Sequence, residues 1–228
     1  MPSPVIIALD FASQDEALAL VDRLGAEAGF YKVGLQLLTE AGPAVVRELV
    51  GRGKQVFLDL KTHEIPHSVM GAVHAAGKLG ACMVTVHASG GSAVLRAAVE
   101  AAQPYPQLRV LALTVITSLA DDDLPEIGLA PSVRAQVERL ALLAAACGCH
   151  GVVASAQEAA FLKPMLPRDA LIVTPGIQLG DGAPPDQVRV ATPGQARQNG
   201  ATHIVMGRSI TQAADPLVAY RAAARAMG

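Results

Sequence analysis

Val5-Ile6-Ile7-Ala8-Leu9-Asp10 is a continuous apolar run that ends in an acid, and the same pattern returns along the whole chain. Unbroken aliphatic runs are typical of parallel strands that are buried on both faces. Ser13 follows, with Glu16 three residues later, which is the capping-box pattern at the start of a helix. The beginning of the chain therefore predicts a buried strand followed by a helix.

Seven more strand-like runs follow, separated by amphipathic or Ala/Leu-rich stretches. Eight strand–helix units within 228 residues predict one domain, residues 1–228, of the α/β class: a (β/α)8 TIM barrel. An open doubly wound sheet stays an alternative on pattern alone, although no G-x-G-x-x-G follows the first strand. The further strands are expected at residues 30–35, 55–61, 82–88, 109–116, 151–155, 171–176 and 203–207. The further helices are expected at residues 43–51, 66–79, 91–103, 132–147, 157–165 and 192–200, with a last one from 208 to the C-terminus.

The composition argues against several classes of protein. Hydrophobic residues make up 51% and charged residues 17% of the chain, unlike a disordered segment. The net charge of −2 lacks the basic surplus of a nucleic-acid binder. No apolar segment reaches the ~18 residues of a membrane span, and no basic leader opens the chain. We therefore expect a cytoplasmic protein that binds neither nucleic acid nor membrane. Cys82, Cys147 and Cys149 are expected to be free thiols.

Polar and ionisable residues gather where the predicted strands end. In a barrel the C-terminal ends of the strands form one rim, and that rim carries the chemistry whereas the opposite rim serves stability. One polar strand end would mean little, but several on one rim predict a site there. These residues are Asp10, Lys32, Asp59, Lys61, His87, Thr117, Ser118, Gly207 and Arg208.

Asp59 and Lys61 are the most informative pair on this rim. Side chains two apart on a strand point to the same face, and Phe57 continues that face into the barrel. Burying either charge alone would be costly, so the two must compensate each other. A structural ion pair is one interpretation. Lys32 on the neighbouring strand and Glu64 would extend the pair to an alternating charged row, which favours a catalytic site.

Gly207 and Arg208, directly after the eighth predicted strand, indicate a phosphate site. Gly207 permits close approach of the backbone, and Arg208 can contact two phosphate oxygens. The helix expected to start here would direct its free N–H groups to the same place. The position after the last strand is the usual phosphate site of such barrels.

The stretch Asp59-Leu60-Lys61-Thr62-His63-Glu64-Ile65-Pro66 resembles the DLKxHDIPNT signature of the orotidine 5'-phosphate decarboxylase family, of the shorter bacterial type. The resemblance covers nearly the whole chain, and so many motifs in the same order are highly specific. The other matching segments are Ala8-Leu9-Asp10, Tyr31-Lys32-Val33-Gly34, Val86-His87-Ala88-Ser89-Gly90-Gly91, Leu113-Thr114-Val115-Ile116-Thr117-Ser118, Val173-Thr174-Pro175-Gly176-Ile177, Asp186-Gln187-Val188-Arg189-Val190 and Met206-Gly207-Arg208-Ser209-Ile210-Thr211.

The resemblance implies a homodimer with shared active sites that converts orotidine monophosphate to uridine monophosphate. It implies that Lys61 protonates C6 of the pyrimidine, that Asp59 lies beside the substrate carboxylate, and that Lys32 and Asp10 bind the ribose. Glu64 would reach into the partner subunit's site, where Ile65 packs on the base. By the same resemblance, the residues that line the pyrimidine or bind the phosphate are Ser68, Thr117, Ser118, Gln178, Gln187, Gly207 and Arg208.

The sequence departs from the family signature at four of these positions. Glu64 replaces an Asp, and His67 and Ser68 replace Asn and Thr. Gln178 replaces the Arg that follows the Thr-Pro-Gly-Ile run, so one cation near the phosphate is absent. The Gly- and Pro-rich segment 180–185 after the seventh strand is the expected lid.

No motif for an organic cofactor or a metal is legible in the sequence. His63 and His67 are four apart, but Pro66 intervenes, which disfavours a zinc site. We therefore expect decarboxylation without cofactor or metal, in which fixed charges stabilise the carbanion. One alternative is a metal-dependent phosphosugar enzyme on a related barrel, such as 3-keto-gulonate 6-phosphate decarboxylase or hexulose phosphate synthase. Another is a weakened, non-catalytic ligand-binding barrel, for which Glu64 and Gln178 are the support.

Overall fold

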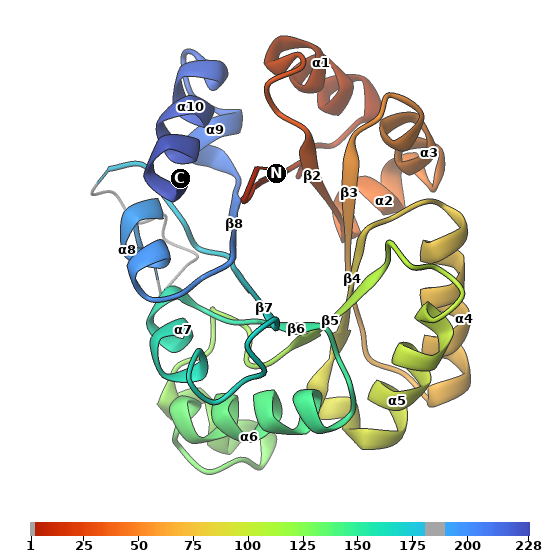
Figure 1. The fold of residues 1–228 in the computed structure, drawn as a ribbon, viewed down its shortest axis with the longest axis vertical. Coiled ribbons are helices and arrows are strands. Elements are labelled where there is room, and N and C mark those ends of the chain that lie inside the picture. The colour runs from red at the N-terminus through yellow and green to blue at the C-terminus, as the bar shows by residue number, and fades with distance from the viewer. Residues whose placement is uncertain (1–2, 181–189) are drawn as a thin grey trace.

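A computed structural model describes residues 3–180 and 190–228 of the chain. Eight parallel strands form a closed barrel in the order of the sequence, and β8 pairs with β1 to complete it (Figure 1). The predicted (β/α)8 barrel is therefore confirmed, and the open sheet is excluded. The strands are β1 Val5–Ala8, β2 Phe30–Gly34, β3 Gln55–Thr62, β4 Met83–His87, β5 Arg109–Leu113, β6 Gly151–Val153, β7 Leu171–Thr174 and β8 His203–Met206.

Helices surround the barrel on its outside (Figure 1). Ser13 caps the first of them as expected, because its side chain accepts a hydrogen bond from the Glu16 amide. The structure adds α2 and two 3-10 helices that the sequence pattern did not predict. The helices are α1 Gln14–Leu24, α2 Leu35–Ala41, α3 Ala44–Gly51, α4 Pro66–Lys78, η1 Ala88–Gly90, α5 Gly91–Ala102, η2 Asp121–Ile127, α6 Val133–Ala146, α7 Ala156–Leu162, α8 Pro193–Gln198, α9 Arg208–Thr211 and α10 Pro216–Met227.

The expectation of one continuous last helix is wrong. A single turn, α9, is separated from α10 by residues 212–215. Asp215 begins α10, and its carboxylate accepts hydrogen bonds from the amides of Leu217 and Val218 at 2.9 and 3.1 Å. Pro216 lacks the N–H that a continuous helix would need and is well suited to the first helical position. This Asp-Pro pair restarts the helix in a new direction.

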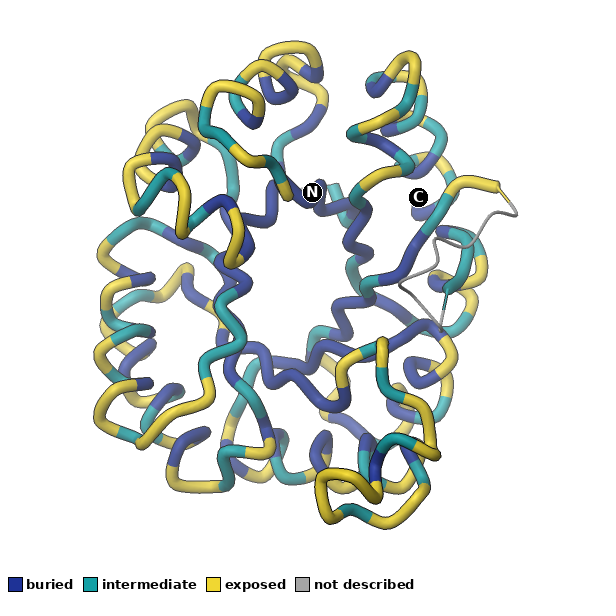
Figure 2. Tube along the Cα trace, turned by 180° about the vertical axis from the view of Figure 1, so that it is seen from behind, coloured by how far each residue is buried: buried dark blue, intermediate teal, exposed yellow. Residues whose placement is uncertain are grey.

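Two apolar regions hold the barrel together. A small cluster fills its interior, and a larger one lies between the sheet and the helices. In Figure 2 the barrel wall is largely buried, while the outer faces of the helices are exposed. The interior cluster consists of Ile6, Ala8, Phe30, Phe57, Met83, Leu111, Leu113, Val153, Val173 and Val205.

All the strands except β3 end earlier than the sequence pattern predicted. β1 stops at Ala8 and β5 at Leu113, so Asp10 and Thr117 lie on the loops beyond the sheet. The apolar runs continue past the ends of β1 and β5 because Leu9 and Val115 are still buried. The consequence is a rim built from loops, on which functional side chains can surround a cavity.

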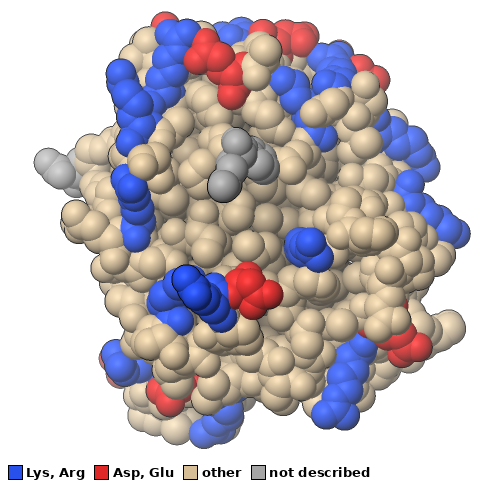
Figure 3. Space-filling view, in the orientation of Figure 1, with Lys and Arg blue, Asp and Glu red and all other residues tan. Residues whose placement is uncertain are grey.

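The outer surface carries mixed charge. In Figure 3, Lys and Arg side chains stand singly or in small groups, with Asp and Glu side chains among them. Within residues 3–180 and 190–228, no helix is both long and apolar enough to cross a bilayer.

Candidate active site

A cavity of about 800 Å³ opens at the C-terminal ends of the strands. The floor of the cavity is formed by side chains of the barrel interior. These are Ala8, Phe57, Leu113, Val153 and Val205. The rim loops after β1, β5, β7 and β8 complete the wall. The lining also includes Asp10, Phe11, Lys32, Asp59, Lys61, Val115, Ile116, Thr117, Ala154, Pro175, Gly176, Ile177, Gln178, Gly207, Arg208, Ser209, Thr211 and Gln212.

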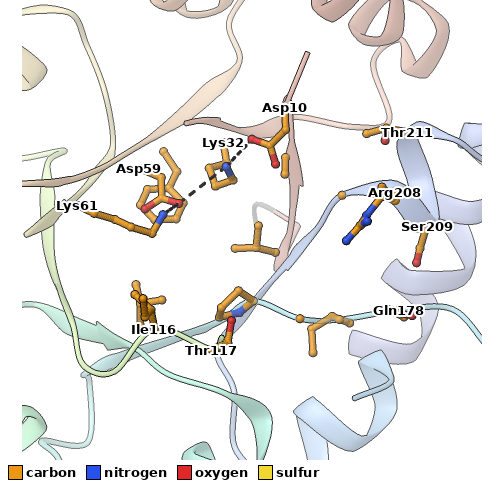
Figure 4. A pocket seen from close by; sticks show the side chains of 18 of the residues that line it. Asp10, Lys32, Asp59, Lys61, Ile116, Thr117, Gln178, Arg208, Ser209 and Thr211 are labelled. Carbon is orange, nitrogen blue, oxygen red and sulfur yellow. Dashed lines mark hydrogen bonds and ion pairs between the residues drawn. The ribbon is translucent and has the colours of Figure 1, made fainter. Parts of the chain in front are cut away.

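Four charged side chains form one continuous row along the β1–β3 side of the cavity (Figure 4). Lys32 Nζ lies 2.9 Å from Asp10 Oδ1 and 3.8 Å from Asp59 Oδ2. Asp59 Oδ2 lies 2.5 Å from Lys61 Nζ. The side chains of Lys32 and Asp59 are each only 10% exposed, so the two inner charges are poorly screened by water. The end members are more accessible, with Lys61 35% and Asp10 52% exposed. The predicted pairing of Asp59 with Lys61 and Lys32 is confirmed, and Asp10 occupies the end of the row.

Gly34 makes room for the row. A Cβ atom at this position would lie 2.8 Å from Lys32 Nζ and 3.2 Å from Asp10 Oδ1. Gly34 pairs with Asp59 in the β2–β3 ladder, so the glycine is level with a member of the row. Any larger residue would push the Lys32 ammonium away from its partners. Nothing in the sequence pattern indicates this requirement.

Thr85 is a second contributor that the sequence analysis missed. It lies on β4, is fully buried, and its hydroxyl donates a hydrogen bond of 2.9 Å to Asp59 Oδ1. The Thr85 hydroxyl oxygen also accepts a hydrogen bond from the Lys61 amide, at 2.9 Å. The available signal was a single polar residue inside the otherwise apolar run of β4.

Lys61 has an unusual backbone. Its φ of +49° is the only positive value among the described residues other than glycine. Such a conformation costs on the order of 1–3 kcal/mol for a residue with a side chain. The β3–β4 register changes at this point, because Leu58 pairs with Val84 and Thr62 with Val86. Local strain of this kind is a frequent mark of a functional position.

The β7–β8 side of the cavity is different in character. Arg208, Ser209 and Gln178 face it in Figure 4, opposite the charged row. The Nε2 atom of Gln178 is buried without a hydrogen-bond partner among the described residues, so it can serve a ligand. The expected helix start is only the one turn of α9, in which the amides of Ile210 and Thr211 donate to Gly207. A long-helix dipole therefore does not act at this end.

Several predicted residues lie outside this cavity. Ser118, Glu64, Ile65 and Ser68 are exposed and do not line it. Glu64 Oε1 accepts a hydrogen bond of 2.8 Å from the amide of Ile65, and Glu64 is not part of the row within its own chain. Their expected roles lie partly in a partner subunit's site and stay predictions. Gln187 and most of the expected lid lie outside the described residues.

His87 stands behind the row without lining the cavity. Its ring stacks on His63 at a centroid distance of 5.2 Å. Burial, together with the neighbouring His63 and Lys61, lowers the pKa of His87 below its ordinary value. Within the described ranges, no three His, Cys, Asp or Glu side chains are grouped as a metal site. Cys82, Cys147 and Cys149 are free thiols, as predicted.

Comparison with known proteins gives consistent matches along the chain. The orotidine 5'-phosphate decarboxylase / HUMPS family matches residues 3–223. A relative from Chromobacterium violaceum, named orotidine 5'-phosphate decarboxylase, is 51% identical over 221 residues, which is 96% of this chain and 90% of the relative. One of the same name from Sodalis glossinidius is 51% identical over 218 residues, covering 94% of this chain and 86% of its own.

A solved structure agrees with this result. The crystal structure of orotidine 5'-phosphate decarboxylase from Lactobacillus acidophilus superposes with a TM-score of 0.88 at 36% sequence identity, and the match covers 99% of both chains. The family match, the sequence relatives and the shared barrel thus all indicate the same family. The chain belongs to the orotidine 5'-phosphate decarboxylase / HUMPS family.

Proposed function

We propose that this chain is a cytoplasmic enzyme that decarboxylates orotidine 5'-phosphate to uridine 5'-phosphate in pyrimidine biosynthesis. The observation that carries the proposal is the cavity itself. It has a row of alternating charges on one side, whose central members Lys32 and Asp59 are buried, an apolar wall below, and Arg208 on the other side. A nucleotide with a planar base, a ribose and a phosphate has the matching sequence of chemical groups. The names of the relatives support the same substrate.

The reaction breaks the bond between C6 of the pyrimidine and its carboxylate. Carbon dioxide leaves, and the electron pair of that bond stays on C6. A cation beside C6 stabilises the developing charge, because the row is held in place by its own contacts before the reaction begins. Lys61 then transfers a proton from its ammonium to C6 and regains one from solvent. Asp59, 2.5 Å from Lys61 Nζ, orients this ammonium.

Contacts far from the reacting carbon position the substrate. Arg208 binds the phosphate, with Gly207 and Gln178 beside it on the same side of the cavity. Lys32 and Asp10, at the end of the row, bind the ribose hydroxyls. Binding energy from the phosphate can be used to orient the base against the row. No cofactor takes part in this proposal, since the row supplies the charge that an electron sink would otherwise provide.

The proposal includes a homodimer. Glu64, Ile65 and Ser68 follow β3 and are exposed in one chain. Ile65 is 61% exposed, which is unusual for a large apolar side chain beside a polar site. In the dimer these residues complete the partner subunit's site, with Glu64 extending the row and Ile65 packing on the base.

The decisive experiment is turnover of orotidine 5'-phosphate, followed in the ultraviolet, with and without EDTA. We expect full activity in both cases. The family also includes the HUMPS branch, so a metal-dependent phosphosugar reaction is the competing assignment. Loss of turnover on chelation and recovery with magnesium would exclude the cofactor-free mechanism. Absence of any turnover with orotidine 5'-phosphate would exclude the substrate.

A further inference from the structure

We propose that Thr85 is a positioning residue, whose hydroxyl holds Asp59 and Lys61 in the arrangement that decarboxylation requires. The inference rests on the proposed function for its catalytic consequence. The geometry behind it stands independently, because one buried hydroxyl contacts both members of the reacting pair. Thr85 is fully buried and does not line the cavity, so its hydroxyl acts through Asp59 and Lys61.

The hydrogen bonds of Thr85 have a fixed direction. An ionised carboxylate only accepts, so the hydroxyl proton must point to Asp59 Oδ1. A backbone amide only donates, so the Lys61 N–H must point to a lone pair of the same oxygen. The hydroxyl thus links the carboxylate to the backbone of the lysine that pairs with it.

The position of Thr85 in the sheet explains why this link is needed. Asp59, Leu60 and Lys61 lie opposite the single residue Thr85, because the β3–β4 register shifts between Leu58 and Thr62. The Lys61 amide therefore has no regular ladder partner on β4, and the hydroxyl takes the place of a backbone carbonyl.

Lys61 depends on this substitute contact. Its backbone is left-handed, and its Nζ donates a hydrogen bond to Asp59 two residues earlier. A residue in that conformation persists only where its surroundings hold it. Thr85 is 0% exposed and β-branched, so its rotamer is restricted and the hydroxyl is held in place. We infer that loss of the hydroxyl releases both the amide and the carboxylate.

Three variants distinguish a positioning role of the Thr85 hydroxyl from a purely structural role. Thr85→Val keeps the shape and the β-branch but removes the hydroxyl, whereas Thr85→Ser keeps the hydroxyl. Thr202→Val is the matched control. The Thr202 hydroxyl also accepts a hydrogen bond from a backbone amide, at 2.9 Å, and donates one to a backbone carbonyl, at 3.1 Å, and both groups belong to Ile172. Thr202 precedes β8, at the opposite end of the barrel from the cavity.

The experiment measures kcat, KM and the inhibition constant of uridine 5'-phosphate for the three variants and the native enzyme. We expect Thr85→Val to lower kcat by about 30-fold or more while KM and product inhibition stay within about threefold. Thr85→Ser should recover kcat to within about threefold of native, and Thr202→Val should leave kcat unchanged on that scale. Thermal unfolding of each variant shows whether the barrel is intact.

Retention of native kcat by Thr85→Val, or an equal loss in Thr202→Val, would overturn the proposal. If Thr85→Val does not fold, Thr85→Ala replaces it under the same criteria. A crystal structure of the hydroxyl-free variant provides a test that does not depend on the reaction. An unchanged Lys61 backbone and Lys61–Asp59 contact in it would refute the positioning role, whereas lack of turnover by the native enzyme counts against the proposed function alone.

Discussion

The two sides of the cavity differ in how their charged side chains are arranged. The β1–β3 side carries two cations and two anions in contact, so its charges balance before any substrate arrives. On the β7–β8 side, Arg208 is the charged residue of the described lining, among uncharged neighbours such as Ser209 and Thr211. A balanced row does not attract a free anion strongly, but it can respond to charge that develops next to it. The comparison therefore separates a side suited to chemistry from a side suited to binding.

Removal of Lys61 tests the chemical side and has the largest expected effect. Lys61→Ala should lower kcat by roughly 10²–10⁴-fold, the range typical of a lost general acid. The fold should persist, with a lower melting temperature because Asp59 loses its closest cation. Steady-state kinetics and thermal unfolding of the same preparation check both parts.

Lys54→Ala is the matched control for Lys61. Lys54 Nζ donates to the carbonyls of Gly25 and Ala28, outside the cavity. This variant should lose stability while keeping its turnover. The proton-donor role would be refuted if Lys61→Ala retained as much as about a tenth of native turnover.

Removal of Arg208 tests the binding side. A charge-assisted hydrogen bond contributes about 1.5–3 kcal/mol, so Arg208→Ala should raise KM by about 10- to 150-fold. The effect on kcat should be smaller, in contrast to Lys61→Ala. By the sequence resemblance, Gln178 stands where the family has an Arg, so we expect Arg208 to carry most of the charge recognition. A change in KM below about threefold would mean that the phosphate is held elsewhere.

Glu64→Asp examines whether the balanced row extends across a dimer. A carboxylate withdrawn by about 1 Å can cost up to ~10²-fold in rate, and we expect a loss of about tenfold. The physical reason is that the shorter acid no longer reaches the partner's row. The measurement is turnover at protein concentrations above and below dimer dissociation. A large gain in activity would show instead that the native site is impaired by its Glu.

Lowering the pH adds positive charge beside the row and has the smallest expected effect. The pKa of His87 is lowered by burial, by His63 and by Lys61, so the folded protein favours the neutral ring. The unfolded chain takes up the proton first as the pH falls through about 6.5, so stability is present above that value and lost below it. His87→Asn should reduce the fall in melting temperature between about pH 7.5 and pH 5.5. An unchanged slope would show that His87 does not contribute.

Periodicity was sufficient for the barrel and for part of the site. The alternation of β3 correctly placed Asp59 and Lys61 beside each other on the interior face. It could not reveal the left-handed backbone of Lys61 or the register shift, because both depend on pairing with β4. Thr85 was missed because threonine is an ordinary strand residue, and only its burial next to Asp59 gives it meaning.

Other differences have their own physical origins. The Asp215-Pro216 signal that divides the last helix is legible in the sequence, but the Ala-rich pattern that follows it masked the break. Gly34 has no side chain to attract attention, and its role appears only when a Cβ is placed against Lys32. Glu64 depends on a second chain, so neither periodicity nor one subunit defines its position.

The strained backbone of Lys61 also predicts how the protein would respond to selection for heat resistance alone. Glycine adopts a φ near +49° without penalty, so Lys61→Gly would relieve the strain while leaving Asp59 short of a cation. A second change, Asp59→Asn, removes that uncompensated charge. Selection for thermostability alone should therefore favour Lys61→Gly together with Asp59→Asn. The resulting barrel would have a higher melting temperature and no catalytic activity. Retention of lysine in such a selection would require that activity be selected at the same time.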